Sequence, residues 1–493
     1  MALSEKNIRN IFVYALPKFA GYGLNLITLP ILTRLLTPKD FGIILLAGAF
    51  PAIAVSVFTF GITFGAERYY FECRNDSKKL NALIFSSQLF LYLSLLVFSF
   101  PVFILKEFIS KIIVGDSSYG LAVFVVFISV YFNQIITFYL RLYQNMERAV
   151  VHSIFTVTQA TVSTAVSLFL IWHFKMSYMG MIFGSLTGAF VVCLAMLFHF
   201  NKNLKIVFSG KILLDNIKYG IQIVPKSFTG FINRFFDKYM LNNMLSLSVV
   251  GIFNIGQTIG NTMFFIMSTV WSSFQPVYYR EVFDKGEAGS VSAGRIFTIF
   301  SYVSLMPVLL LILFAQEIIY IVAPAPYYEA IDIIIILLGG VATQVFGMYV
   351  AVQYAYSKKA YWSFPNIIVG TVTNVVANII LIPKYGLIGA GISTVLSTFA
   401  TNCLATFIGQ KLYRIQYEWK TIAQLFSVIA VAIVSVLYLR AIEFDMIYLY
   451  LIKVVFIVLF ICIGIMSKVI TKHSIEKVFS ALFKYQRIKE VQA

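Results

Sequence analysis

The sequence predicts an all-α, polytopic membrane protein with about fourteen transmembrane helices. Of its 493 residues, 60% are hydrophobic and only 12% are charged, whereas soluble domains carry about 25% charged residues. The charged residues lie in short clusters separated by charge-poor runs. Each run is long enough to cross a hydrocarbon core of about 30 Å as a helix. Most of the chain is therefore expected to lie in lipid.

The charge-poor runs define the expected helices in chain order. They fall near residues 10–33, 41–66, 80–105, 118–140, 149–172, 176–199, 219–241, 246–276, 296–317, 333–354, 361–383, 386–409, 421–440 and 446–467. The first run is longer than the apolar core of a signal peptide, and no small-residue cleavage motif follows it. We therefore expect it to remain as the first helix of the protein.

The lysines and arginines between the runs predict the orientation of the chain. The termini and the loops on their side hold 26 of them, while the opposite loops hold 8, among which we count Lys238. Because cytoplasmic loops are enriched in Lys and Arg, both termini are expected in the cytoplasm. The net charge of +17 is spread over these loops and forms no basic domain, so we expect no nucleic-acid partner.

An internal repeat divides the chain into two similar halves. Polar and small residues of the first half recur 208 or 209 residues later. The pairs are Lys18 with Lys226, Asn25 with Asn233, Gly42 with Gly251, and Lys175 with Lys384. We therefore predict two pseudo-symmetric six-helix lobes, at residues 1–205 and 206–412, followed at 413–493 by two further helices and a basic cytoplasmic tail. Parallel repeats of this kind suit alternating access around a central site.

Three cationic residues lie inside the predicted spans and form the candidate site. Lys18 and Lys226 each follow a proline at the equivalent place in the two lobes, and Arg234 lies deeper in the seventh span. A charge near the bilayer centre costs roughly 2.5–3.5 kcal/mol on insertion scales, so such residues usually face a cavity or a partner. Three like charges in one cavity predict an anionic ligand, such as a phosphate or pyrophosphate. The alternative for the two lysines is that they reach the nearby interface.

Other polar residues near these cations are expected to support the site. Asp237, three residues after Arg234, lies on the same helical face and is expected to orient it. Asn25 and Asn233 are expected to offer hydrogen bonds to sugar hydroxyls, although hydrogen bonding between helices explains them equally well. Lys453 in the last span is a candidate for lipid contact, with the outer interface as the alternative.

The sequence contains no signature of an enzyme or of a cofactor site. The four histidines and four cysteines have no metal-ligand spacing. No P-loop and no nucleophile with an adjacent base are found, so ATP is not implied as a direct energy source. We therefore expect a transporter rather than an enzyme, with no metal and no cofactor.

Three stretches carry a resemblance to a known family. They are the Pro17-Lys18 region, the linker LPILTRLLTPKDFG from Leu29 to Gly42, and the segment YGLIGAG from Tyr385 to Gly391. The chain resembles the Wzx-type polysaccharide flippases, in the superfamily that also contains the MATE drug exporters, and the linker is the more specific match.

The resemblance implies the function. It implies a flippase of the bacterial inner membrane that moves undecaprenyl-pyrophosphate-linked oligosaccharide, the repeat unit of O-antigen in lipopolysaccharide or of another surface polysaccharide, from the cytoplasmic to the outer leaflet. Membrane lipid, a polysaccharide polymerase and chain-length proteins are the partners that it implies. Coupling to Na⁺ or H⁺ is left open.

Three alternatives are weighed against this function. A MATE-like drug exporter needs carboxylates in its cavity, and the runs 10–33 and 41–66 contain none. A flippase for lipid II would share the fold and the cationic cavity, but the linker is more similar to the polysaccharide branch. A membrane-embedded glycosyltransferase or polymerase is expected to carry paired acidic residues or a large outer loop. Connections here do not exceed about twenty residues.

Overall fold

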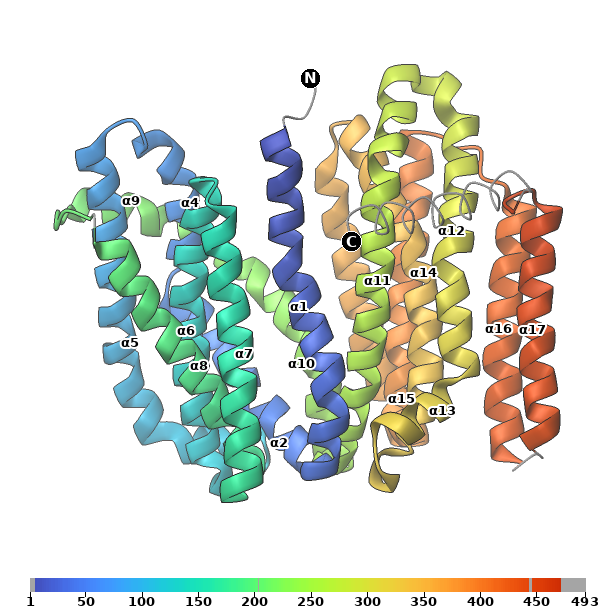
Figure 1. Ribbon diagram of the computed structural model, residues 1–493, viewed down its shortest axis with the longest axis horizontal. Helices are drawn as coiled ribbons and strands as arrows, with labels where there is room; N and C mark the ends of the chain where they lie inside the picture. The colour runs from blue at the N-terminus through green and yellow to red at the C-terminus, as the bar shows by residue number, and fades with distance from the viewer. Residues whose placement is uncertain (1–4, 203, 443–445, 471–493) are drawn as a thin grey trace, which may run out of the picture. The chain divides into compact units, whose positions relative to one another are not determined.

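The computed structural model describes residues 5–202, 204–442 and 446–470; the side chains of residues 5–16, Lys18, Lys226 and Met446 lie outside this description. All regular elements of the described residues are helices (Figure 1). Ten stretches are long and apolar enough to cross a membrane. Two of these, 247–313 and 360–412, each contain two predicted spans. Together with α1 and α10, which are not among the ten, they are consistent with fourteen spans. The all-α membrane fold is confirmed.

The chain forms two compact units. The first contains residues 1–255, 319–329 and 382–387, and the second contains 256–318, 330–381 and 388–493. Helices of the first unit are α1 (Glu5–Leu35), α2 (Pro38–Ala47), α3 (Ala49–Phe58), α4 (Ile62–Cys73), α5 (Ser77–Ile113), α6 (Gly120–Asn145), α7 (Ala149–Phe174), α8 (Ser177–Asn201), α9 (Gly210–Gly220) and α10 (Val224–Met244). Helices wholly or mainly in the second are α11 (Leu247–Lys285), α12 (Ser290–Leu313), α14 (Ala330–Tyr356), α15 (Ser363–Leu412), α16 (Trp419–Ala441) and α17 (Met446–Met466), while α13 (Ala315–Val322) is divided between them. The predicted lobes, at 1–205 and 206–412, and the added segment 413–493 therefore stay a proposal based on the repeat.

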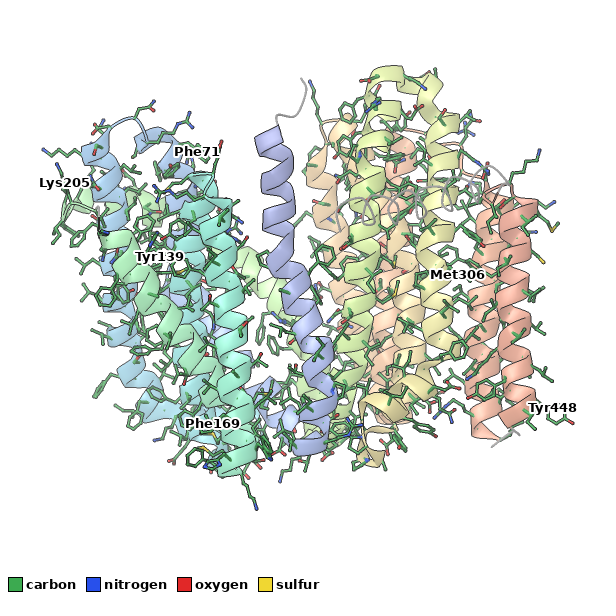
Figure 2. The ribbon with its side chains drawn as sticks, in the orientation of Figure 1. Phe71, Tyr139, Phe169, Lys205, Met306 and Tyr448 are labelled. Carbon is green, nitrogen blue, oxygen red and sulfur yellow. The ribbon has the colours of Figure 1, made fainter. Side chains whose placement is uncertain are left out.

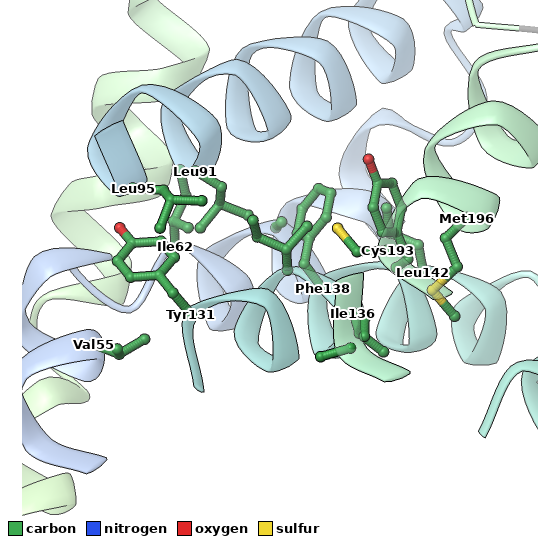
Figure 3. Close-up of a cluster of buried hydrophobic side chains, with 14 of the residues drawn as sticks. Val55, Ile62, Leu91, Leu95, Tyr131, Ile136, Phe138, Leu142, Cys193 and Met196 are labelled. Carbon is green, nitrogen blue, oxygen red and sulfur yellow. The ribbon is translucent and has the colours of Figure 1, made fainter. Parts of the chain in front are cut away.

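The core of the first unit lies among α3, α4, α5, α6 and α8. Figure 3 shows part of it, with Leu91 and Tyr131 near one another and Phe138 near Cys193. The Tyr131 hydroxyl donates to Ser94 Oγ at 2.6 Å, so this buried polar group is satisfied. Burying aromatic and aliphatic side chains from five helices fixes how these helices pack.

Large apolar side chains also cover the outside of the helices. Phe169 on α7 and Tyr448 on α17 are both more than half exposed (Figure 2). A water-soluble protein rarely exposes extended apolar patches. These outer faces are suited to contact with lipid tails, which agrees with a multi-pass membrane protein.

The predicted span 41–66 is broken into three helices. The break between α3 and α4 lies at Phe60 and Gly61, both with positive φ. A Cβ on Gly61 would lie 2.4 Å from the carbonyl oxygen of Gly220, so only glycine allows this approach to the end of α9. A second positive-φ glycine, Gly386, kinks the long helix α15 and separates two predicted spans.

Part of the linker that carries the family resemblance forms a helix cap. Thr37 and Asp40 form a capping box at the start of α2, with the Asp40 carboxylate 2.8 Å from the Thr37 backbone nitrogen. Asp40 also accepts a hydrogen bond from Ser177 at 2.6 Å. Arg34 donates to the carbonyls of Pro30 and Ile321. The motif therefore fixes the connection between α1 and α2.

The sequence repeat is matched by reciprocal contacts inside the first unit. A Cβ on Gly42 would lie 2.0 Å from the Leu247 carbonyl oxygen, and one on Gly251 would lie 1.9 Å from that of Pro38. Leu247 and Gly251 are the 209-residue counterparts of Pro38 and Gly42. The two helix starts therefore touch through equivalent surfaces, as across a two-fold axis.

A second reciprocal pair involves side chains. Thr33 Oγ1 donates to the carbonyl of Val322 at 2.6 Å, while Asn242 Nδ2 donates to that of Val114 at 2.7 Å. Asn242 is the counterpart of Thr33 at an offset of 209, and Val322 is that of Val114 at 208. These contacts explain why residues 319–329, far along the chain, belong to the first unit.

Candidate functional site on helix 10

The helix α10 carries most of the predicted site residues. It begins at Val224, with Pro225 in its first turn, where proline removes no helical hydrogen bond. The hydroxyl of Ser56 on α3 donates to Ser227 at 2.9 Å, which fixes the start of α10 against α3. Lys226 lies between Pro225 and Ser227, and Lys18 lies in α1 of the same unit. The side chains of both lysines are outside the described part of the structure.

Arg234 is exposed on α10. Its guanidinium lies 5.8 Å from the centroid of the Phe235 ring. Within the described residues it has no ion pair. An exposed guanidinium with free donors can bind two oxygens of a phosphate at once. This residue is therefore available to an anionic ligand.

Asp237 has a different partner from the one that the sequence suggested. Its carboxylate lies 3.1 Å from Lys238 Nζ, and both side chains are almost fully buried. The Lys238 amine also donates to the carbonyl oxygen of Arg234. Our prediction that Asp237 orients Arg234 is thus replaced by an Asp237–Lys238 ion pair. Our count of Lys238 in an outer loop was also wrong, because it lies inside α10.

The two predicted asparagines are exposed at equivalent places. Asn25 lies on α1 and Asn233 on α10, each seven residues after its lysine. Exposed amides can donate and accept hydrogen bonds, as sugar hydroxyls require. Their assignment to sugar binding remains a proposal.

Lys453, in the second unit, is buried rather than facing lipid. It is 1% exposed, and its amine forms an ion pair with Glu317 on α13. The same amine lies 5.0 Å from the Phe314 ring centroid and 4.9 Å from that of Tyr450. The prediction of a lipid contact does not fit this burial. The pair instead ties α17 to α13.

A second ion pair ties α16 to the same region. Arg440 Nε lies 3.0 Å from Asp332 Oδ1 at the start of α14, and its Nη1 donates to Gln316 at 2.9 Å. The sequence alone did not reveal these pairs, because the partners are more than 100 residues apart. These two ion pairs therefore attach the added helices α16 and α17 to α14 and α13.

Replacing Glu317 with alanine should destabilise the protein by about 1–3 kcal/mol, because the buried Lys453 amine loses its carboxylate. The Glu317→Ala/Lys453→Met double variant should recover most of this loss, since no buried charge is then unpaired. Denaturant unfolding in detergent measures both. Equal stability of the Glu317→Ala variant and the wild type would contradict the assignment.

Comparison with known proteins places this chain in a family. Residues 8–278 match the model of a family described as polysaccharide biosynthesis protein. No curated protein matches the chain. Among solved structures, the lipid II flippase MurJ in an inward closed conformation is similar, with a TM-score of 0.70 and 12% identity, covering 94% of this chain and 99% of that one.

A second group of solved structures shares the fold. A multidrug resistance MATE family transporter of the MOP superfamily is similar in its inward-facing conformation, with a TM-score of 0.62 and 14% identity over 82% of this chain and 97% of that one. An outward-facing conformation of a multidrug resistance MATE family transporter gives a TM-score of 0.54, also at 14% identity, over 82% of this chain and 95% of that one. The chain thus has the fold that these MATE and MurJ structures share. Because the family model covers more than half of the chain, the protein belongs to the polysaccharide biosynthesis protein family of Wzx-type flippases, as the resemblance implied.

Proposed function

We propose that the protein flips an undecaprenyl-pyrophosphate-linked oligosaccharide, the repeat unit of O-antigen or another surface polysaccharide, from the cytoplasmic to the outer leaflet of the bacterial inner membrane. The observation that supports this most is the exposed guanidinium of Arg234, which has no ion pair among the described residues, in a chain of the polysaccharide biosynthesis family. Lys18 and Lys226 would contact the same pyrophosphate, and Asn25 and Asn233 the sugar.

The proposed cycle is alternating access between the two repeated lobes. The parallel repeat supports it, because such repeats can rock about a site between them. In this proposal both termini are cytoplasmic, turnover is coupled to Na⁺ or H⁺, and the product is passed to a polymerase and chain-length proteins.

Replacing Arg234 with alanine should weaken the binding of a soluble pyrophosphate-sugar headgroup by about 10- to 100-fold, because a charge-assisted hydrogen bond contributes about 1.5–3 kcal/mol. Calorimetry on the purified protein measures this. The Arg234→Lys variant should recover part of the affinity through its charge, and export in cells should follow the same order.

The matched control is Arg280→Ala, which removes an exposed arginine from another helix and should bind normally. Binding measurements with two further ligands distinguish the alternative functions. Binding of an organic dye cation without any response to the anion would favour a drug exporter. Preference for the lipid II headgroup over other pyrophosphate sugars would favour a MurJ-like substrate. Normal binding and export in all three single variants, Lys18→Ala, Lys226→Ala and Arg234→Ala, would disprove the cationic site.

A further inference from the structure

Two adjoining pockets lie at one end of the second unit. One, of about 970 Å³, is bordered by the loop between α15 and α16, and the other, of about 600 Å³, lies among α14, α15 and α16. Gln410 and Trp419 line both pockets. The two spaces are therefore neighbours, and a ligand with two chemically different parts can occupy both.

The two pockets differ in chemistry. The smaller one is lined mainly by apolar side chains, which include Phe346, Phe399 and Phe426. The larger one contains Lys411 and Arg414, both exposed, and one acidic residue, Glu287. Among the described residues neither cation forms an ion pair. The site is thus apolar at one end and cationic at the other.

Lys411 lies at the boundary between the two pockets. Its amine is 4.3 Å from the centroid of the Phe407 ring, and Phe407 lines the apolar pocket. Trp419 is about half exposed at the same boundary. Tryptophan and long basic side chains favour the level of the lipid headgroups. The boundary therefore has the composition of a membrane interface.

The wall of the cationic pocket is held rigidly. Ser290 Oγ donates to the Arg414 carbonyl at 2.9 Å, and Tyr413 Oη donates to that of Gly286 at 2.7 Å. Gln410 donates to the Ile415 carbonyl and accepts from its N–H. Burial raises the pKa of Tyr413, so its hydroxyl keeps the proton that it donates. A loop fixed in this way presents its cations without a large ordering cost on binding.

We propose that these pockets form a binding site for an anionic phospholipid, with the phosphate at Lys411 and Arg414 and an acyl chain in the apolar pocket. Charge complementarity selects the anionic headgroup, and basic pockets between transmembrane helices bind anionic lipid headgroups elsewhere. The Lys and Arg distribution predicts that this loop faces the cytoplasm, where anionic lipids face the protein. The site concerns the surrounding bilayer and does not depend on the proposed transport substrate.

The test is titration of the purified full-length protein with phosphatidylglycerol or with phosphatidylcholine of the same acyl chains, read out by native mass spectrometry and thermal unfolding. The wild type should bind phosphatidylglycerol saturably and phosphatidylcholine weakly. The Lys411→Gln/Arg414→Gln variant should bind phosphatidylglycerol about tenfold or more weakly, because two charge-assisted contacts are lost. Ala423→Phe, which fills the apolar pocket, should also reduce binding.

The matched control is Lys211→Gln/Lys218→Gln, which removes two exposed lysines of α9 and should bind like the wild type. Equal loss in this control would show that only general surface charge attracts the lipid and would overturn the proposal. So would unchanged binding in both pocket variants. If undecaprenyl pyrophosphate displaced phosphatidylglycerol and bound more tightly, with the same dependence on Lys411 and Arg414, the occupant would be the lipid part of the proposed transport substrate instead, and the proposal would be overturned.

Discussion

Replacing Gly251 with alanine should destabilise the protein by about 1–3 kcal/mol or more, the usual cost of overpacking. The added Cβ would lie 1.9 Å from the Pro38 carbonyl oxygen. Because the obstacle is backbone at a capped helix start, no rotamer change can relieve the clash. Denaturant unfolding in detergent measures the loss. Gly42→Ala should behave alike, since its Cβ would meet the Leu247 carbonyl at 2.0 Å.

The double variant distinguishes one shared contact from two separate ones. Once either alanine has separated α2 from the start of α11, the second should cost less than it does alone, so the two effects should not add. Gly230→Ala on α10 is the control, because its Cβ meets nothing within 4 Å. It should be neutral or stabilising by roughly 0.5–1 kcal/mol through helix propensity. A Gly251→Ala variant as stable as Gly230→Ala would contradict the reciprocal contact.

The fold could be predicted from the sequence because lipid imposes a simple rule. A span must be long and poor in charge, so the runs between charge clusters mark the helices. Local breaks could not be predicted in this way. The break at Gly61 depends on the approach of Gly220, which lies far along the chain. The repeat was visible through Gly42 and Gly251, but the reason that both are glycine appears only when the two helix starts meet.

The contacts of the candidate site residues were less predictable, because the sequence does not show which partner a charged side chain has. Arg234 was expected to be paired within its helix and is exposed, whereas Lys238 was expected outside the membrane and is buried. Asp237 is three residues after Arg234 and directly before Lys238, so the sequence spacing permits either pairing, and the structure shows the pair with Lys238. Lys453 is a similar case, because its partner Glu317 is 136 residues away.

Replacing Asp237 with alanine should destabilise the protein by about 3–5 kcal/mol, the typical cost of removing one partner from a buried ion pair. Lys238 is 2% exposed and would keep only the Arg234 carbonyl as a described hydrogen-bond partner of its amine. An ammonium group in this position cannot regain the hydration that it lost on folding. Denaturant unfolding in detergent, with a helicity readout, measures the loss.

The Asp237→Ala/Lys238→Met double variant separates the unpaired charge from the loss of packing. If the buried charge is the cause, the double variant should be more stable than Asp237→Ala alone, because methionine fills similar space without a charge. The control is Glu72→Ala, which breaks the exposed Arg68–Glu72 pair and should change stability by less than about 1 kcal/mol. If Asp237→Ala cost no more than Glu72→Ala, the Lys238 amine would have to reach water, and Lys238 would be a further cation of α10 that a ligand could contact.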